Sequence, residues 1–405
     1  MLITAGSVLA LSACTSSRSD SNAPSEVRIG LLGQALKSPG TGLDAVRGAE
    51  LAAVVVNENS PVPIPLAGSG LPHLGGAKLR IIQADSSPTN STDAQLQPVL
   101  KATALTTQGV AGIVSADNAT NTGLASERTE RIGVPFIGAV ATADFLTGRG
   151  LDWFFRATPT DGMLAQAALG WLDQRGTKSA RRLGVVAAND VASNEALTAL
   201  LSQASQAGDQ VVPAPAGFAS GSNANQVRPS LDKARGSNPD AIVGVAAQQG
   251  DARALLSAAR AGRSVTVGMG AGFTAQAIRQ ASQTTTDLGH SAVWSQDFAQ
   301  RNQVANAVSQ LYQQRYKTPM TETAAETFTA TMLLAQAVDA AGSVGAQQVR
   351  TALLGLDVPG RDTIMPWGGI RFDQTGENTL AAGLVEQVTQ SSARVVFPRE
   401  LAANT

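Results

Sequence analysis

A regular alternation of short apolar segments and helical segments is the feature that most constrains the fold of this chain. The first run opens with residues 26–33, an apolar segment that ends in glycine, and continues with apolar residues at helical spacing over 44–57. Within the same run we expect strands at 78–84, 109–115 and 135–140, and helices at 92–107 and 119–131. Strands that alternate with helices predict a parallel sheet with helices on both faces.

The same alternation begins again after residue 156. We expect strands at 182–188, 210–213, 241–246 and 264–268, and helices at 162–175, 194–207, 225–234 and 251–261. A chain of 405 residues is longer than one hydrophobic core usually serves, so the two runs predict an α/β protein with two doubly wound parallel-sheet lobes. Beyond residue 290, helices expected at 302–316, 322–341 and 346–356 precede strands expected at 368–372, 381–388 and 393–397. This order indicates that the chain returns to the earlier lobes.

Composition and missing motifs exclude several classes of protein. The net charge is −1 and no long basic tract occurs, so we expect no nucleic-acid partner. After residue 24 no apolar run is long enough to cross a membrane. His73 and His290 lack other ligands at metal-binding spacing, and the glycine-rich segment 268–272 lacks the phosphate-binding motifs and is expected to be a turn at an interlobe crossing. No Gly-x-Ser-x-Gly motif occurs, so we expect no metal, no cofactor and no enzyme activity.

The first residues carry the pattern of a targeting signal. Leu11-Ser12-Ala13-Cys14 closes a short apolar run, opens onto a serine-rich stretch and resembles a bacterial lipobox, in which the cysteine is lipidated. Cys14 is the only cysteine, so no intrachain disulfide can form. Residues 1–24 are therefore expected to be a signal peptide and polar tether. No Lys or Arg precedes the apolar run, so either the true start lies upstream or this is a buried apolar segment beside an incidental cysteine.

Several short sequence segments, taken together, carry a family resemblance. They are VRIGLLG at 27–33 with DAVRGAELA at 44–52, GVPFI at 133–137 with AT at 141–142, FRATPTD at 155–161, YQQRY at 312–316 with Pro319, and AAGS at 340–343. Their order and spacing over residues 27–398 resemble the type I periplasmic solute-binding proteins, specifically the branched-chain amino-acid-binding family of ABC importers.

That resemblance implies the type I periplasmic binding protein fold, with two lobes joined by three crossings. One lobe would comprise residues 27–155 plus 270–365, and the other 156–269 plus 366–405. A ligand would lie in the cleft between the lobes and shift a hinge equilibrium from open to closed. A membrane permease would then recognise the closed form.

The resemblance also implies a carboxylate-binding segment at Asn118, Ala119 and Thr120. These residues lie between an expected strand and helix, where free backbone N–H groups and the helix dipole suit an anion. The alternative is that Asn118 or Thr120 only caps the helix. In the family, Ala141 and Thr142 match a pair whose alanine carbonyl meets the ligand ammonium and whose threonine hydroxyl meets its carboxylate.

The second lobe contributes two more candidates. Asp251 aligns with the family's acidic ligand for the ammonium, although Asp at a helix start is also a preferred N-cap. Ser193 stands where many relatives carry a tyrosine that helps to hold the ligand, so an aromatic wall is lost and the ligand's identity is left open. Arg156 and Asp161, at the first crossing, are interpreted as structural hinge residues.

Together these features predict an extracytoplasmic receptor of an ABC importer that binds an amino acid or a similar small polar solute. We expect a monomer, lipid-anchored through Cys14 on the outer face of the cytoplasmic membrane, with an ABC permease as partner. The alternative is a ligand sensor or scaffold of the cell envelope that uses the same fold without transport.

Overall fold

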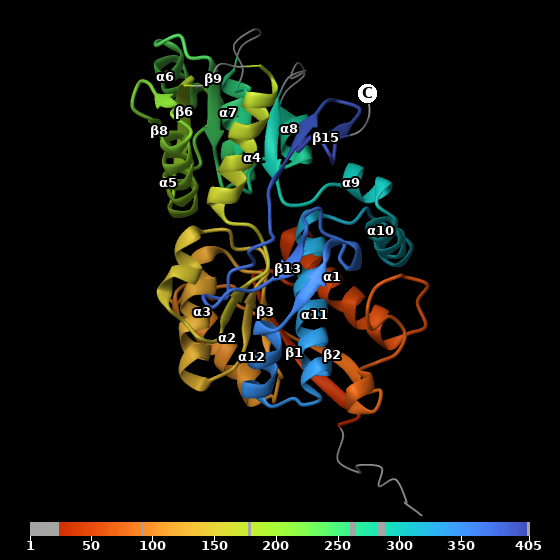
Figure 1. Cartoon of the computed structure of the whole chain (residues 1–405). Helices are drawn as coiled ribbons and strands as arrows, with labels where there is room; N and C mark the ends of the chain where they lie inside the picture. The colour runs from red at the N-terminus through yellow and green to blue at the C-terminus, as the bar shows by residue number, and fades with distance from the viewer. Residues whose placement is uncertain (1–23, 91, 177–179, 260–264, 282–287, 403–405) are drawn as a thin grey trace, which may run out of the picture.

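A computed structural model describes residues 24–90, 92–176, 180–259, 265–281 and 288–402 of the chain. It has two lobes, each built on its own sheet, and the chain passes between them three times (Figure 1). The prediction of an α/β fold with two parallel-sheet lobes is confirmed. Cys14 and the expected signal segment lie outside the described residues. Within the described residues, no helix has the length and apolarity to span a membrane.

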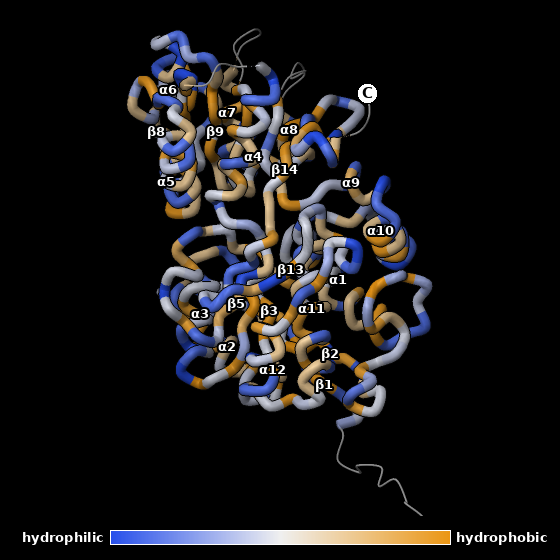
Figure 2. The backbone as a smooth tube through the Cα atoms, in the orientation of Figure 1, coloured by the Kyte–Doolittle hydropathy of each residue, from blue (hydrophilic) through white to orange (hydrophobic). Residues whose placement is uncertain are grey.

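The sheet of the first lobe is entirely parallel, in the order β2-β1-β3-β4-β5. Its strands are β1 (Glu26–Gly33), β2 (Lys78–Asp85), β3 (Ile113–Ser115), β4 (Phe136–Gly138) and β5 (Phe154–Arg156). Neighbouring residues of β1 show why both faces need helices: Leu31 and Leu32 are fully buried and belong to different core clusters. Figure 2 shows hydrophobic segments gathered within the lobes.

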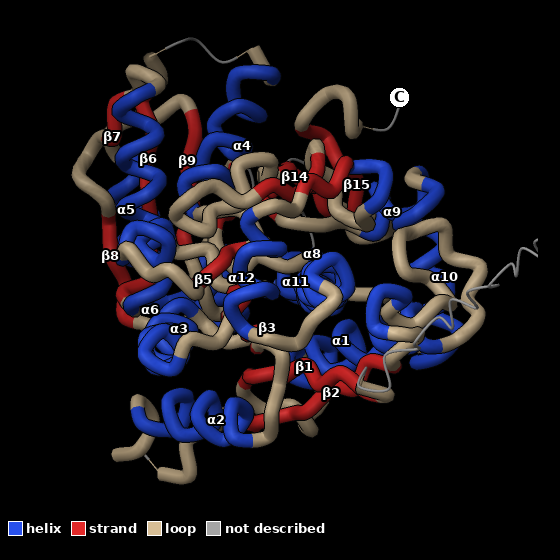
Figure 3. The backbone as a smooth tube through the Cα atoms, turned by 60° about the horizontal axis from the view of Figure 1, so that its bottom comes forward, coloured by secondary structure: helices blue, strands red, loops and turns tan. Residues whose placement is uncertain are grey.

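Helices from both ends of the chain cover this first sheet (Figure 3). They are α1 (Thr41–Asn57), α2 (Leu96–Thr107), α3 (Ala119–Ile132), α11 (Glu322–Ala341) and α12 (Ala346–Leu354). Helices α1 and α11 pack together closely, and Gly48 permits this because a Cβ atom there would lie 2.2 Å from the carbonyl oxygen of Ala324. The late helix α11 thus packs against the first lobe.

The sheet of the second lobe runs in the order β15-β14-β11-β10-β9-β6-β7, with β8 also paired to β6. Its strands are β6 (Arg182–Asn189), β7 (Gln210–Val211), β8 (Ala216–Ala219), β9 (Ala241–Val245), β10 (Val267–Met269), β11 (Gly289–Ala292), β14 (Leu384–Val388) and β15 (Ala393–Phe397). Strand β14 pairs antiparallel with both of its neighbours, β11 and β15, and the other pairs of this sheet are parallel. The helices of this lobe are α4 (Asp161–Gln174), α5 (Val191–Gln206), α6 (Ala224–Arg235), α7 (Gln249–Ala258) and α8 (Ala275–Ala281).

The second crossing lies later than expected. Strand β11 pairs with β10 and β14, so the chain leaves the second sheet only after Ala292 and not near residue 270. Gly270, at φ 98°, makes only the turn that follows β10. The sequence Gly-His-Ser-Ala of β11 has too few apolar residues for its pattern to predict a strand. After it come α9 (Gln296–Arg301), which contacts β15, and α10 (Gln303–Tyr316), which contacts α1.

The third crossing is also later than the expected boundary at residue 365. Strands β12 (Asp357–Pro359) and β13 (Gly369–Arg371) form a separate antiparallel pair. Val358 and Ile370 of this pair line a small cavity with Phe328 of α11, so the pair belongs to the first lobe. The chain joins the second sheet only at β14. Three short 3-10 helices complete the described structure: η1 (Pro72–Leu74), η2 (Asp144–Arg149) and η3 (Gly360–Asp362).

Candidate functional site

The carboxyl ends of both sheets face the junction between the lobes. Strand β5 ends at Arg156 and the chain enters α4 of the second lobe at Asp161, so the carboxyl edge of the first sheet borders that lobe. Helix α4 runs away from the junction and β6 returns toward it (Figure 1). Parallel strands beside β6 therefore also end at the junction. Ligands of doubly wound folds bind outside such carboxyl ends, and all the candidate residues lie on them.

The segment after β3 begins helix α3. Asn118 is the N-cap, and its side chain accepts a hydrogen bond from the backbone N–H of Asn121 at 3.0 Å, so the capping interpretation is confirmed. Ala119 is buried and Thr120 is exposed. The first N–H groups of a helix have no intrahelical acceptor, so those of Ala119 and Thr120 are the groups that an anion would use. Capping by Asn118 and anion binding are compatible.

Asp117, directly before this segment, was not among the candidates from sequence. It is 2% exposed, and its carboxylate accepts hydrogen bonds from Ser86 Oγ at 2.6 Å and Asn121 Nδ2 at 3.3 Å. Burial raises the pKa of Asp117 to about 6, against the opposing effect of these hydrogen bonds. When ionised, Asp117 places a negative charge beside the N–H groups of α3. An acidic residue at the end of a buried strand was the signal that could have identified it.

Thr142 joins the first lobe to the start of α4. Its hydroxyl donates to Asp161 Oδ1 at 2.7 Å, and its carbonyl accepts from the Asp161 N–H, also at 2.7 Å. A threonine hydroxyl has one proton, so the oxygen of Thr142 is left with lone pairs that can accept. This geometry favours acceptance from a ligand ammonium over the expected donation to a ligand carboxylate. Ala141, its neighbour, is buried.

Asp161 is a buried carboxyl group at the junction. Burial raises its pKa to about 6; the hydrogen bond from Thr142 opposes this shift, and the negative charges of Asp144 and Glu195 add to it. Glu195 belongs to α5 of the second lobe, and burial together with Asp190 raises its own pKa. The junction therefore holds carboxyl groups from both lobes close enough to influence one another, which favours a ligand that carries a positive charge.

Ser193 is fully buried within the second lobe. Its hydroxyl donates to Asp190 Oδ2 at 2.6 Å and accepts from the backbone N–H of Ala247 at 2.9 Å. Asp190 is the N-cap of α5, so Ser193 ties the start of that helix to the segment after β9. The hydroxyl of Ser193 is thus engaged inside the lobe, and its contact with a ligand stays a prediction.

Asp251 lies in the first turn of α7. The N-cap of this helix is Gln248, so the alternative that Asp251 is the N-cap is wrong. Asp251 is 1% exposed, and its two carboxylate oxygens accept from Ser220 Oγ at 2.6 Å and the Gly221 N–H at 2.7 Å. It holds the loop after β8, and a role toward a ligand stays a prediction. No cluster of three metal-binding side chains occurs within the described residues.

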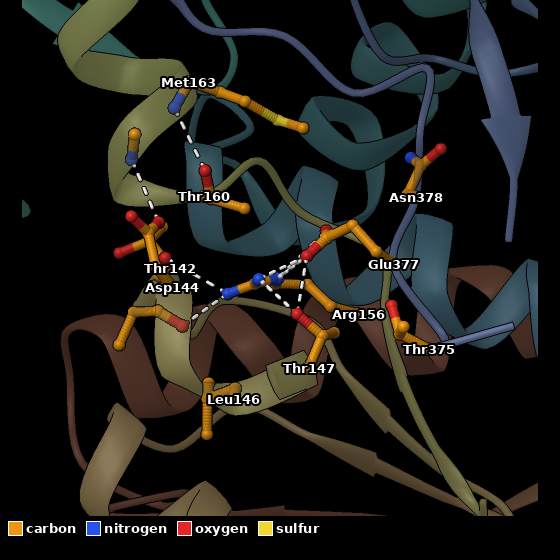
Figure 4. Close-up of polar contacts among 12 residues, drawn as sticks. Thr142, Asp144, Leu146, Thr147, Arg156, Thr160, Met163, Thr375, Glu377 and Asn378 are labelled. Atoms are coloured by element: carbon orange, nitrogen blue, oxygen red, sulfur yellow. Dashed lines mark hydrogen bonds and ion pairs between the residues drawn. The ribbon is translucent and has the colours of Figure 1, made fainter. Parts of the chain in front are cut away.

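Arg156, expected to be structural, is completely buried at the end of β5 (Figure 4). Its guanidinium group pairs with the carboxylate of Glu377, which follows β13 by several residues. Glu377 was not singled out in the sequence. The two residues are 221 positions apart, and no local pattern connects them.

The chain matches the model of the periplasmic binding protein family over residues 26–391. A Leu/Ile/Val-binding protein homolog 7 from Brucella abortus (strain 2308) is 24% identical over 384 residues, which cover 88% of this chain and 87% of that protein.

Solved structures show the same fold at low sequence identity. An ABC transporter substrate-binding protein from Desulfitobacterium hafniense in complex with Leu has a TM-score of 0.71 and 19% identity, over 92% of this chain and 100% of that one. A solute-binding protein of an R. palustris ABC transporter in complex with benzoate has a TM-score of 0.69 and 17% identity, over 92% and 95%. The predicted resemblance is confirmed, as is the prediction that the chain is not an enzyme, because the family consists of solute-binding proteins. The chain belongs to the periplasmic binding protein family, and its fold is that of the type I members.

Proposed function

We propose that this chain is the solute receptor of an ABC importer, and that it binds an amino acid or a similar small polar solute between its lobes. The observation that carries the proposal is the hydrogen bond from Thr142 to Asp161 at the facing carboxyl edges. It leaves the hydroxyl oxygen of Thr142 as an acceptor for a ligand ammonium. The N–H groups at the start of α3 supply the complementary site for a carboxylate.

The relatives support the ligand class. The ligands in the complexes of two structural neighbours, Leu and benzoate, share a carboxylate and an apolar part. The carboxyl groups Asp161 and Glu195 favour an additional amino group on the ligand of this chain. Because Ser193 is small and buried, the apolar part of the ligand would meet a different wall from the tyrosine found in many family members.

Attachment to the membrane belongs to the same proposal. Lipidation of Cys14 would tether the receptor on the outer face of the cytoplasmic membrane and raise its effective concentration at a permease. Durable attachment needs more than one acyl chain, because a single chain binds membranes only marginally. The receptor would act as a monomer whose closed form the permease recognises.

A thermal-shift screen of the soluble chain tests this function. The panel comprises the twenty amino acids, their amides, and small organic acids that include benzoate. A ligand that binds only the folded state stabilises it by about 2.7 kcal/mol at a hundredfold excess over its Kd. A shift with one chemical class that is lost in Thr142→Val would support the receptor, whereas no shift with any compound would contradict it.

The hydrogen bonding of Ser193 and Asp251 favours a second candidate. Both side chains are engaged inside their own lobe, as expected if the site has lost its ligand and the chain serves as an envelope sensor or scaffold. In that case, the same screen would give no shift. Cross-linking in intact cells would then capture an envelope protein other than a permease.

A further inference from the structure

The guanidinium group of Arg156 connects two distant parts of the chain. Nη1 donates to the carbonyl oxygens of Ala143 at 2.5 Å and Thr142 at 3.2 Å. Nη2 donates to Thr147 Oγ1 at 2.9 Å, and Nε donates to the carboxylate of Glu377 at 3.1 Å. Arg156 thus binds the loop after β4 through Nη1 and Nη2, and the third crossing through Nε and Nη2 (Figure 4).

Glu377 completes this arrangement from the third crossing. It pairs with Arg156 and also accepts a hydrogen bond from Thr147 Oγ1 at 2.8 Å. The backbone supports the same contact, because the Arg156 N–H donates to the Gly376 carbonyl at 2.8 Å. A Cβ atom at Gly376 would lie 2.0 Å from the carbonyl oxygen of Phe154, so only glycine permits this approach. The third crossing therefore lies directly against the end of β5.

The other side of the same loop is bound to the second lobe. Thr142 is bonded to Asp161 through both its hydroxyl and its carbonyl, and the Gly162 N–H donates to Asp144 Oδ1 at 3.0 Å. Residues 142–147 are consequently held between the start of α4 and the third crossing. A movement of either crossing has to be accommodated by the loop that carries Thr142.

We propose that Glu377 is a positioning residue that acts through Arg156 to fix the loop of Thr142, and so links the third crossing to the ligand site. Its consequence for ligand binding rests on the proposed function. Its consequence for the loop does not, because the contacts that produce it lie within the chain itself. The competing explanation is an ordinary structural ion pair, whose loss would lower stability without a specific effect on residues 142–147.

The variant Glu377→Gln separates these explanations, because it keeps the shape of the side chain and removes its charge. Glu26→Gln is the matched control, since Glu26 forms an exposed ion pair with Arg28 at the opposite end of the first sheet. Amide hydrogen exchange is followed by mass spectrometry on the unliganded protein. We expect faster exchange in peptides that cover 142–147 for Glu377→Gln, by about tenfold, and none for Glu26→Gln. Unchanged exchange in these peptides would overturn the proposal.

Calorimetric titration with L-leucine gives the second readout. We expect affinity to fall about tenfold in Glu377→Gln and to be unchanged in Glu26→Gln, within the range usual for coupled sites. Faster exchange without any loss of affinity would overturn the link to the ligand site. If the wild-type chain does not bind L-leucine, that result counts against the proposed ligand class, and hydrogen exchange alone decides the positioning role.

A milder variant covers the case in which Glu377→Gln does not fold. Thr147→Val removes only the hydroxyl that bridges Arg156 and Glu377. It should produce the same local increase in exchange at a smaller amplitude.

The variant Arg156→Lys keeps the positive charge but loses the planar group that contacts both the loop after β4 and the third crossing. It should therefore match Glu377→Gln in the exchange of residues 142–147. An Arg156→Lys protein with wild-type exchange there would also overturn the proposal.

Discussion

The hydroxyl of Thr142 donates its one proton to the carboxylate of Asp161 at 2.7 Å, which fixes what this hydroxyl can offer a ligand. With that proton committed, the oxygen presents only lone pairs. A ligand ammonium fits such an oxygen, and a ligand carboxylate does not. The hydrogen bond between Thr142 and Asp161 therefore gives this part of the candidate site a preference for an ammonium over a carboxylate. The sequence alone left that preference unspecified.

The variant Asp161→Asn tests this preference for an ammonium group. The amide of asparagine can donate to Thr142, which frees the threonine proton and removes the nearby negative charge. We expect L-leucine to bind about tenfold more weakly, as is typical for the loss of a hydrogen bond to a charged group. Binding of 4-methylpentanoate, which has no amino group, should change by less than about twofold. Calorimetric titration measures both, and an equal loss for the two compounds would show that Asp161 does not act on the amino group.

Asp117 predicts a specific dependence of stability on pH. Its pKa is raised from 3.8 to about 6 by burial, so the folded state keeps a proton that the unfolded chain releases. The stability this provides is fully present below pH 3.8 and is lost as the pH rises through about 6. Asp117→Asn stays neutral and lacks this loss.

The measurement for Asp117 is urea unfolding of the wild type and Asp117→Asn at pH 4.5 and 7.5. From the lower to the higher pH, the variant should gain about 2 kcal/mol of unfolding free energy relative to the wild type, because part of the loss has already occurred at pH 4.5. Using the difference between the two proteins cancels titrating groups that do not interact with Asp117, such as Asp373, whose pKa is lowered by hydrogen bonds against the effect of burial. Parallel pH profiles would refute the assignment.

The contact of α1 with α11 predicts a costly substitution. In Gly48→Ala the new methyl group would lie 2.2 Å from the carbonyl oxygen of Ala324, so the helices must separate. Overpacking of this kind costs about 1–3 kcal/mol of unfolding free energy. Gly250→Ala is the matched control, because Gly250 is also helical and a methyl group there meets no atom within 4 Å. It should be neutral or stabilising by up to about 1 kcal/mol, and similar losses in both variants would contradict the packing argument.

The sequence predicted those parts of the fold that depend on local pattern. Strand β1 has a continuous apolar run and helix α11 has a long helical pattern, and both elements lie where expected. Strand β11 was missed because Gly-His-Ser-Ala owes its place to its neighbours β10 and β14 rather than to its own residues. In the candidate site, the strand ends were predictable, but the pairing of Arg156 with Glu377 was not. It depends on a contact across most of the chain, which no local pattern encodes.

The proposed anchor yields a prediction about Cys14. Lipidation requires its sulfur, so Cys14→Ser should move the chain from the membrane fraction of the expressing bacterium to the soluble fraction, or leave it as an uncleaved precursor. Ser16→Ala, two residues later, is the matched control and should stay with the membrane. If residues 1–13 are instead a buried apolar segment beside an incidental cysteine, the two variants will fractionate alike. Detergent-phase partitioning with mass measurement of the N-terminal peptide distinguishes these outcomes, because attached acyl chains add mass as well as membrane affinity.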